Sequence, residues 1–382
     1  MTRPAPSPTT GLSEEDVAHI KGSIGMAAVV VQWNEEASSD SIRHYAWGIG
    51  DENPLWLSDS YARMTRFGGR VAPPTFLYSI CDAEVAMGIP EGIQTIQVGA
   101  SLEFIRPIRL GERVWARTFV EDVRERQGRR SGRGVEQVGR TDYLVGDELV
   151  GIVRNRMVCV GAGLRGKLHE TRQPHVYTAD EREGIRCGIL AEEIRGKRTR
   201  FAELVSVGDA VPEVVKGPLD LLTMTAYYAG AIGTAAYRGV ETRVRQQELI
   251  KTGHPTAPTN LGAEHFLAEP FPGLGHQDVT VAHAMGMPGP YDTGNQRVAW
   301  MAHCLTNWMG DDADLRSLAV SIKQPNIFGD TQWIGGTVTR RFSDEAHGAC
   351  AEITLSAVNQ LGVETTTAVG VVSLAEMRAE WI

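Results

Sequence analysis

The chain has 382 residues, of which 42% are hydrophobic and 22% are charged, and its formal net charge at pH 7 is −9. This length allows two domains with a sizeable core. The excess of acidic residues argues against nucleic acid or an anionic membrane as the main partner. A small anionic ligand is still possible, because it needs only a local basic pocket. The five cysteines are an odd number and form no CxxC pair, so reduced thiols are predicted rather than a disulfide framework or a zinc site.

Residues 1–11 are rich in proline, serine and threonine and lack the apolar core of a signal peptide. They are therefore predicted to form a disordered tail. No uncharged apolar run is long enough to span a bilayer. We expect a cytoplasmic protein without a membrane span.

Two motifs each occur twice in the chain, in the same order. The segment HYAWGIG at residues 44–50 matches YYAGAIG at 227–233, with Tyr, Ala, Ile and Gly at equal offsets. Farther along, PIRLGE at 107–112 matches PNIFGD at 325–330, and both have the form P-x-x-x-G followed by an acidic residue. This repetition predicts two diverged copies of one structural unit.

Between its two motifs, each copy has a segment with the period of an apolar helix. In the first copy the helix is expected to begin at the prolines 73–74, because proline suits the first turn of a helix. The apolar side chains at helical spacing are Phe76, Ile80, Ala83 and Met87 in the first copy, and Val298, Met301, Leu305 and Trp308 in the second. Asp292 or Thr293 is expected to cap the second helix.

Strands are predicted on both sides of the P-x-x-x-G turns, because apolar and polar residues alternate over residues 97–104, 351–357 and 365–371. Each copy thus has the order loop, long apolar helix and antiparallel strands. This order predicts an α+β fold in which an antiparallel sheet wraps around one buried helix in each copy. We expect the first copy over residues 12–164, a linker over 165–177 and the second copy over 178–382.

The second copy is expected to be the more remodelled one. Residues 178–194 have the pattern of an extra helix, and a Gly-, Pro- and His-rich loop is inserted at 253–290. Loops of this length usually contain functional residues or cover another part of the protein. Any of the histidines of this loop could cover a relocated site, but their spacing fits no metal motif, and no metal is predicted: His254, His265, His276 and His283.

The first copy also contains a motif that resembles a known family. Residues 45–56 read YAWGIGDENPLW, followed by Tyr61-Ala62 and by FGG at 67–69. This segment resembles the D-x-N-P-x-H motif of the MaoC-like acyl-CoA hydratase/dehydratase family in its two-hot-dog form, whose N-terminal dehydratase domain the first copy resembles. Residues 305–311, LTNWMGD, resemble the family's C-terminal region. The resemblance implies a double hot-dog, with two antiparallel sheets each wrapped around a long apolar helix.

The chain departs from the family motif in both copies. Where the family places its catalytic histidine, the first copy has Trp56. In the second copy the positions of Asp, Asn, Pro and His are occupied by Thr234, Ala236, Tyr237 and Gly239. The second copy is therefore not expected to use the family mechanism, and the first retains only part of it.

Hydration of an α,β-unsaturated thioester needs a base for water, a proton for the α-carbon and stabilisation of the charge on the thioester oxygen. The motif makes Asp51 the candidate base, and Asn53 is expected to hold the water or to orient Asp51. In the family the first helix packs against the thioester, so the backbone N–H groups of Thr75 and Phe76 are the candidate oxyanion donors. The alternative is that Asp51 and Asn53 only brace a turn, as D-x-N-P often does.

Four other residues are secondary candidates. His44 is a possible proton donor or a packing residue of a helix, and Trp56 stands at the histidine position. Tyr291 and Asp292 precede the second helix, where they match the active-site segment of the family, although Asp292 also suits a helix cap.

Several arginines are candidates for contact with the phosphates of coenzyme A. The Arg- and Gly-rich stretch 124–140 is expected to form a solvated hairpin between two strands, with phosphate contact as a minor alternative. Arg66, Arg70 and Arg106 are comparable candidates.

The resemblance implies a hydratase or dehydratase acting on an acyl-CoA or acyl-carrier thioester, with no cofactor. A bulky or unusual acyl group is expected, because the copy that gives up catalysis can widen its tunnel. Two alternatives remain: a non-catalytic acyl-CoA-binding subunit of a hetero-oligomeric dehydratase, and a hot-dog thioesterase. A homodimer, or a hetero-oligomer with another hot-dog subunit, is expected.

Overall fold

The computed structural model describes residues 11–30, 32–90, 92–128, 132–161, 169–231, 238–254 and 272–377. Most of the predicted tail, much of the inserted loop and the residues Thr234, Ala236 and Tyr237 lie outside these ranges. The strands are β1 (Ala27–Ala28), β2 (Gln94–Phe104), β3 (Trp115–Gly128), β4 (Gly132–Val145), β5 (Glu148–Val160), β6 (Ala210–Lys216), β7 (Asp314–Ile322), β8 (Gln332–Asp344), β9 (Gly348–Asn359) and β10 (Glu364–Ser373).

The helices lie mostly between the strands of each copy. The α-helices are α1 (Glu14–Lys21), α2 (Ser39–Ile49), α3 (Pro54–Leu57), α4 (Asp59–Ala62), α5 (Leu77–Ile80), α6 (Ala179–Leu190), α7 (Leu221–Ala231), α8 (Val240–Lys251), α9 (Val279–Ala284) and α10 (Gly294–Met309). Short 3-10 turns cover Pro74–Phe76, Ala202–Leu204 and Pro272–His276. Helix α6 confirms an extra helix at the start of the second copy.

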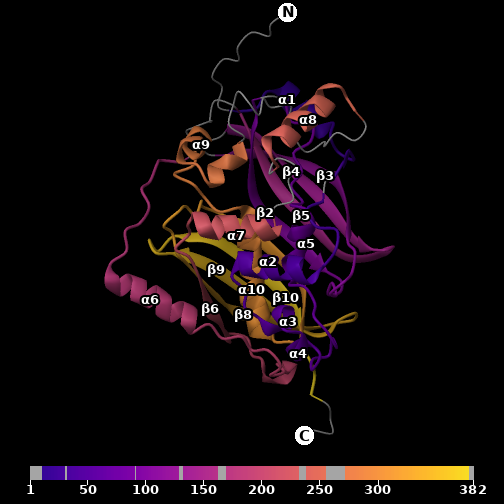
Figure 1. Ribbon diagram of the computed structural model, residues 1–382, viewed down its shortest axis with the longest axis vertical. Coiled ribbons are helices and arrows are strands. Elements are labelled where there is room, and N and C mark those ends of the chain that lie inside the picture. The colour runs from indigo at the N-terminus through magenta and orange to yellow at the C-terminus, as the bar shows by residue number, and fades with distance from the viewer. Residues whose placement is uncertain are drawn as a thin grey trace, which may run out of the picture.

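The strands of both copies form one antiparallel ten-stranded sheet, in the order β1-β3-β4-β5-β2-β7-β10-β9-β8-β6 (Figure 1). Read from each outer edge inward, β1-β3-β4-β5-β2 corresponds strand for strand to β6-β8-β9-β10-β7. The copies meet where β2 pairs with β7, from Gly99 opposite Ser321 to Glu103 opposite Ser317. The predicted repeat is confirmed, and the sheets of the two copies are joined edge to edge.

The two P-x-x-x-G turns have the same geometry in both copies. Glu112 accepts a hydrogen bond from the backbone N–H of Arg109 at 2.8 Å, and Asp330 accepts one from Ile327 at 2.9 Å. Arg109 is bridged to Val71, as Ile327 is bridged to Tyr291. These bridges fix the start of the central helical segment in each copy at an equivalent place.

The first repeated motif forms the contact between α2 and α7, which lie side by side in Figure 1. A Cβ atom on Gly48 would lie 2.8 Å from the carbonyl oxygen of Ala226, and one on Gly230 would lie 2.5 Å from that of His44. Each glycine therefore allows the other helix to approach closely. Both copies therefore use this segment at their mutual interface.

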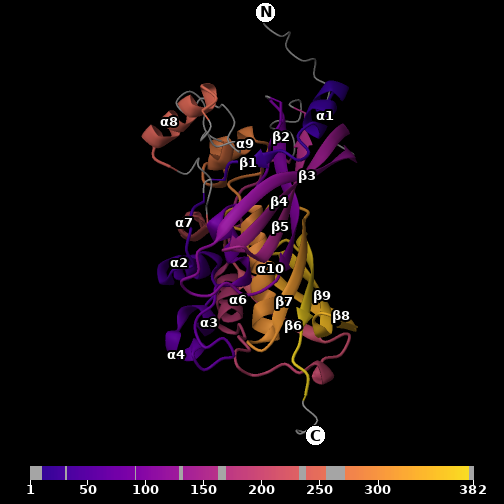
Figure 2. The same cartoon turned by 90° about the vertical axis from the view of Figure 1, so that its right-hand side faces the viewer.

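Helix α10 is the buried helix predicted for the second copy. Thr293, rather than Asp292, is its N-cap and accepts a hydrogen bond from the Gln296 N–H at 3.1 Å. All residues from Asn295 to Met309 are buried. In Figure 2, α10 lies between the sheet and the helices α2 and α7.

The corresponding helix of the first copy is much shorter than predicted. The chain is helical only from Pro74 to Ile80, and residues 81–87 are not helical, although most of them, including Ala83 and Met87, are buried. The Asp82 side chain accepts the Glu84 N–H at 3.2 Å, and Ala83 has a φ of +53°. Such a local side-chain bond competes with helical backbone bonding, so the prediction of a long apolar helix here is wrong.

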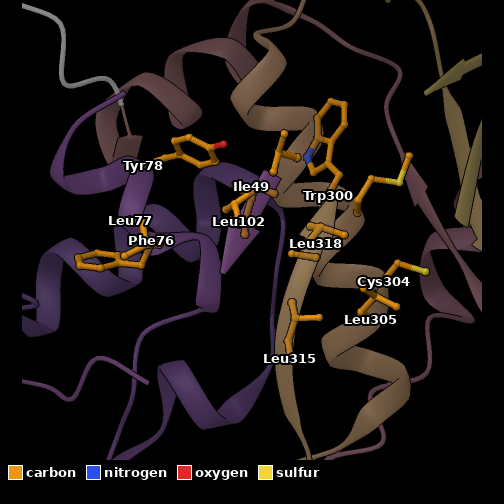
Figure 3. Packing of buried hydrophobic residues seen from close by; sticks show 14 of the residues in the cluster. Ile49, Phe76, Leu77, Tyr78, Leu102, Trp300, Cys304, Leu305, Leu315 and Leu318 are labelled. Atoms are coloured by element: carbon orange, nitrogen blue, oxygen red, sulfur yellow. The ribbon is translucent and has the colours of Figure 1, made fainter. Parts of the chain in front are cut away.

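Both copies contribute to one hydrophobic core (Figure 3). Phe76, Leu77 and Tyr78 of the first copy belong to the same buried cluster as Trp300 and Leu318 of the second. Burial of such side chains is the main favourable term in folding. Within the described residues, no helix is both long and apolar enough to cross a membrane.

Candidate active site

An apolar pocket lies where the two copies meet. Asn53, Leu55 and Trp56 of the motif form one part of its wall, and Thr306 and Met309 of α10 form another. The remaining walls include Phe67, Val71, Ala72, Pro73, Pro74, Leu77, Phe104, Ile108, Val150 and Leu315. A concave apolar site with a few polar groups at one end is the usual form of a small-molecule site.

The Asp51 carboxylate lies behind the pocket wall and is 1% exposed. Helix α2 ends at Gly50, which has left-handed backbone angles (φ 64°, ψ 45°) that turn the chain toward α3. The backbone N–H of Asn53 donates to Asp51 Oδ1 at 3.0 Å, and the Trp56 indole N–H donates to Oδ2 at 2.9 Å. Asp51 therefore braces its own loop and is also held in a fixed orientation.

Asn53 begins α3, where its side chain accepts the Leu55 N–H at 3.0 Å and Pro54 occupies the first helical position. This is the cap that the D-x-N-P sequence predicts. Trp56 follows on α3 and lines the pocket with its indole against Asp51. The residue that replaces the motif histidine is thus a donor to the motif carboxylate.

The motif carboxylate also faces His303 of α10, which the sequence analysis missed. His303 Nε2 lies 3.6 Å from Asp51 Oδ1 and 2.9 Å from Glu192 Oε1. Asn307, one turn farther along α10, donates to the same oxygen of Glu192 at 2.8 Å. Two carboxylates from different copies therefore converge on one imidazole.

A buried lysine completes the charged cluster. Lys216 of β6 donates to the carbonyl oxygens of Ile49 and Gly50, at 3.0 and 2.7 Å, and thereby satisfies the end of α2. Burial lowers the pKa of Lys216, and Glu192 and Asp51 oppose that shift. Desolvation alone would raise the pKa of Glu192, but the hydrogen bond and charge of His303, together with Lys216, lower it to about 2.

The oxyanion candidates lie at the predicted helix start. The Phe76 N–H donates to the carbonyl oxygen of Pro73 at 2.8 Å, so this group is already engaged and the Phe76 assignment is not supported. Thr75 is buried beside it. Pro73 and Pro74 line the pocket directly, which leaves the Thr75 amide as the candidate donor.

Of the four secondary candidates, Trp56 contacts Asp51, whereas His44, Tyr291 and Asp292 lie elsewhere in the described part of the chain. His44 lies exposed on α2, and its role as a proton donor stays a prediction. Asp292 forms a buried bidentate ion pair with Arg297, at 2.6 and 2.7 Å, and accepts Asn326 Nδ2 at 3.0 Å. The Tyr291 ring packs on that of His276, with centroids 4.2 Å apart.

The other histidines and the arginines form no second site in the part of the chain that the structure describes. His254 is exposed and His265 is not described, and no group of three or more candidate metal ligands is found among the described residues. Residues 124–128 and 132–140 belong to the paired strands β3 and β4, as predicted for a hairpin, but residues 134–139 are buried, so the prediction of a solvated hairpin is wrong there. Arg66 and Arg70 are bound to Asp314 and Asp59.

An acidic pair occupies the non-helical segment of the first copy. Burial raises the pKa of Asp82 to about 6, and burial with the neighbouring Asp82 charge raises that of Glu84 to about 8. The side chains of Asn155 and Asn295 both donate to the backbone carbonyl of Asp82. This segment is therefore held between the two copies by hydrogen bonds to its backbone.

Replacement of Glu84 by Gln is expected to raise the melting temperature by a few degrees at pH 8 and to change it little at pH 4.5. The folded protein binds the Glu84 proton more tightly than the unfolded chain does, so ionisation of Glu84 costs stability as the pH rises from about 4.5 to about 8. Thermal unfolding at both pH values tests this. Glu213→Gln, an exposed change on β6, is the control, and an equal effect of both variants would contradict the prediction.

Comparisons with known proteins agree with this arrangement. Residues 24–150 match the model of the FAS1-like dehydratase domain region. The chain is 28% identical over 116 residues to the 3-hydroxybutyryl-CoA dehydratase of Methylorubrum extorquens, covering 30% of this chain and 73% of that protein. It is 23% identical over 150 residues to a UPF0336 protein of Streptomyces avermitilis, covering 38% and 80%.

Solved structures extend the similarity to both copies. A MaoC-like dehydratase superposes with a TM-score of 0.62 at 16% identity, over 93% of this chain and 100% of that chain. The peroxisomal multifunctional enzyme type 2 of Drosophila melanogaster gives a TM-score of 0.50 at 12% identity, over 90% of this chain and 48% of that chain. The double hot-dog fold is thereby confirmed, whereas the family-model match lies in the first copy.

Proposed function

We propose that this chain, which belongs to the MaoC-like family of hot-dog dehydratases, adds water to or removes it from the α,β-position of an acyl-CoA thioester. The observation that carries the proposal is the position of Asp51, behind Asn53 and Trp56 in the wall of an apolar pocket. A base held by two hydrogen bonds next to an apolar acyl site is what this reaction requires.

In the hydration direction, Asp51 takes a proton from water as the water oxygen bonds to the β-carbon. The electrons of the double bond move toward the thioester, whose oxygen needs a donor such as the Thr75 amide. The protonated Asp51 then gives the proton it took from water to the α-carbon, which restores the carboxylate. Asn53 holds the loop that carries Asp51 by capping α3. Trp56 stands between Asp51 and the pocket, so a shift of its indole must admit water to the carboxylate.

The pocket suits an apolar acyl chain with an anionic carrier. Most of its wall is aliphatic or aromatic, and Arg106 and Arg316 border it, one from each copy. Guanidinium groups form forked contacts with phosphates. We propose coenzyme A as the carrier and a bulky acyl group as the substrate, since the wall is drawn from both copies.

The isolated chain is expected to hydrate an enoyl-CoA, so that the enoyl absorbance falls without release of free thiol. Crotonyl-CoA and longer enoyl-CoAs are the probes, and a thiol reagent reports hydrolysis in parallel. No loss of enoyl absorbance with any of these compounds would contradict the proposal. Release of free CoA without hydration would indicate a thioesterase.

A second candidate function is a non-catalytic acyl-CoA-binding subunit of a larger dehydratase. The Trp56 indole favours it, because this side chain occupies the histidine position and covers Asp51. Binding of acyl-CoA without turnover, with activity restored by a hot-dog protein that carries an intact D-x-N-P-x-H motif, would support this candidate. Hydration by the isolated chain would eliminate it.

A further inference from the structure

The proposed reaction leaves one buried titratable group at the site without a role. His303 is 1% exposed and lies on the central helix of the second copy, facing the loop of the first. Its Nδ1 has no hydrogen-bond partner among the described residues, whereas its Nε2 faces two carboxylates.

A comparison of the two copies shows that the second copy has a histidine at this position and the first does not. His303 lies twelve residues after Tyr291, which is bridged to the second P-x-x-x-G turn. The residue twelve positions after the equivalent Val71 is Ala83. The first copy thus keeps the motif carboxylate and the second keeps an imidazole, and the fold brings these two groups together at a single site.

We propose that His303 is a positioning residue for Asp51, supplied by the second copy in place of the histidine that the motif lacks at Trp56. The inference rests on the proposed function, because it assigns His303 a part in that reaction. His303 exchanges no proton with the substrate. When protonated, its imidazole attracts the Asp51 carboxylate and orients it for the attack of water.

The geometry supports an electrostatic role rather than a direct hydrogen bond. The separation of 3.6 Å between His303 Nε2 and Asp51 Oδ1 is too long for a hydrogen bond. It lies within the range of an ion pair. Among the described residues, Asp51 accepts hydrogen bonds from two uncharged donors, the backbone N–H of Asn53 and the indole N–H of Trp56. A carboxylate that is 1% exposed is stabilised by a nearby cation.

Glu192 and Asn307 keep the imidazole in place. His303 Nε2 lies 2.9 Å from Glu192 Oε1 and 3.0 Å from Asn307 Nδ2, and Asn307 also donates to the same Glu192 oxygen at 2.8 Å. The hydrogen bond of one ring nitrogen fixes the orientation of the whole ring. The other titratable groups near His303 are Lys216, whose ammonium is bound to backbone carbonyls, and Cys304, whose pKa burial raises to about 12.

The test is the pH profile of kcat/KM for the wild-type chain and for His303→Gln, with an enoyl-CoA that the wild type hydrates. Glutamine can still donate to Glu192, so the variant is designed to fold. Loss of the cation is expected to move the acidic limb of the profile upward by about one to three pH units. At pH values below this limb, kcat/KM of the variant is expected to fall about tenfold per pH unit. At high pH, kcat/KM should recover in part.

Two further variants separate positioning from loss of structure. His276→Gln replaces another partly buried histidine away from the pocket and is expected to leave the limb where it is. Glu192→Gln is expected to shift the limb less than His303→Gln does, and the double variant should be no worse than His303→Gln alone, because both residues act through one ring.

The outcomes separate this inference from the proposed function. If Asp51→Asn is inactive while His303→Gln only lowers kcat equally at all pH values, the inference is wrong and the proposed function stands. If the wild type hydrates no enoyl-CoA, both fail. If His303→Gln does not fold, an unchanged limb in Glu192→Gln overturns the inference, and an upward shift supports it.

Discussion

Replacement of Asp51 by Asn is expected to lower kcat for enoyl-CoA hydration by about 10²–10⁴-fold and to leave the fold intact. General-base catalysis contributes a factor of this size, and an amide cannot accept the proton of water at neutral pH. Asparagine has the same shape and keeps one oxygen for the N–H groups of Asn53 and Trp56. Steady-state kinetics give the loss, and near-ultraviolet circular dichroism reports whether the side-chain packing is retained.

The control for this variant is Asp40→Asn. Asp40 is an exposed carboxylate in the first turn of α2, where it pairs with Arg43, and it lies away from the pocket. Its replacement should leave kcat unchanged. Activity retained in Asp51→Asn would move the base elsewhere, with the acidic pair Asp82 and Glu84 as the next group to replace.

The sequence was sufficient to predict the repeated architecture, because the repeat is local in both copies. The P-x-x-x-G turns, the alternating strands and helix α10 each follow from residues that lie close together in the chain. The same is true of the cap at Asn53, where a short polar side chain and a proline determine the start of α3. The joining of the two sheets through β2 and β7 could not be predicted in this way, because strand pairing at a sheet edge is a long-range choice.

Two features of the site depended on contacts that no local pattern reveals. The first-copy helix ends at Ile80, because Asp82 forms a local side-chain bond and because Asn155 and Asn295 hold its backbone, the latter from 213 residues away. His303 is 252 residues from Asp51, in a helix that is apolar on most of its surface. In the sequence, a functional role of His303 was indicated only by its position on such a helix. That position becomes informative when the central segments of the two copies are aligned, because the first copy has no histidine there.

Replacement of Asp292 by Asn is expected to destabilise the protein by about 3–5 kcal/mol, because it leaves the buried charge of Arg297 without a partner. The side chains of this pair are 0% and 4% exposed, and both oxygens of Asp292 are bound to Arg297. Arg297 also donates to the carbonyl oxygen of Gln324, so its guanidinium is held in place even without the acid. Equilibrium unfolding in urea measures the loss.

This variant also decides between the two candidate carboxylates. The double variant Asp292→Asn with Arg297→Met should recover most of the lost stability, since replacing a buried ion pair by groups of similar volume is often nearly neutral. The folded fraction of either variant should hydrate enoyl-CoA at the wild-type rate, because Asp292 is bound on both oxygens and does not line the pocket. A variant that keeps the wild-type stability but loses turnover would instead make Asp292 the base and would reduce Asp51 to a brace of its own loop.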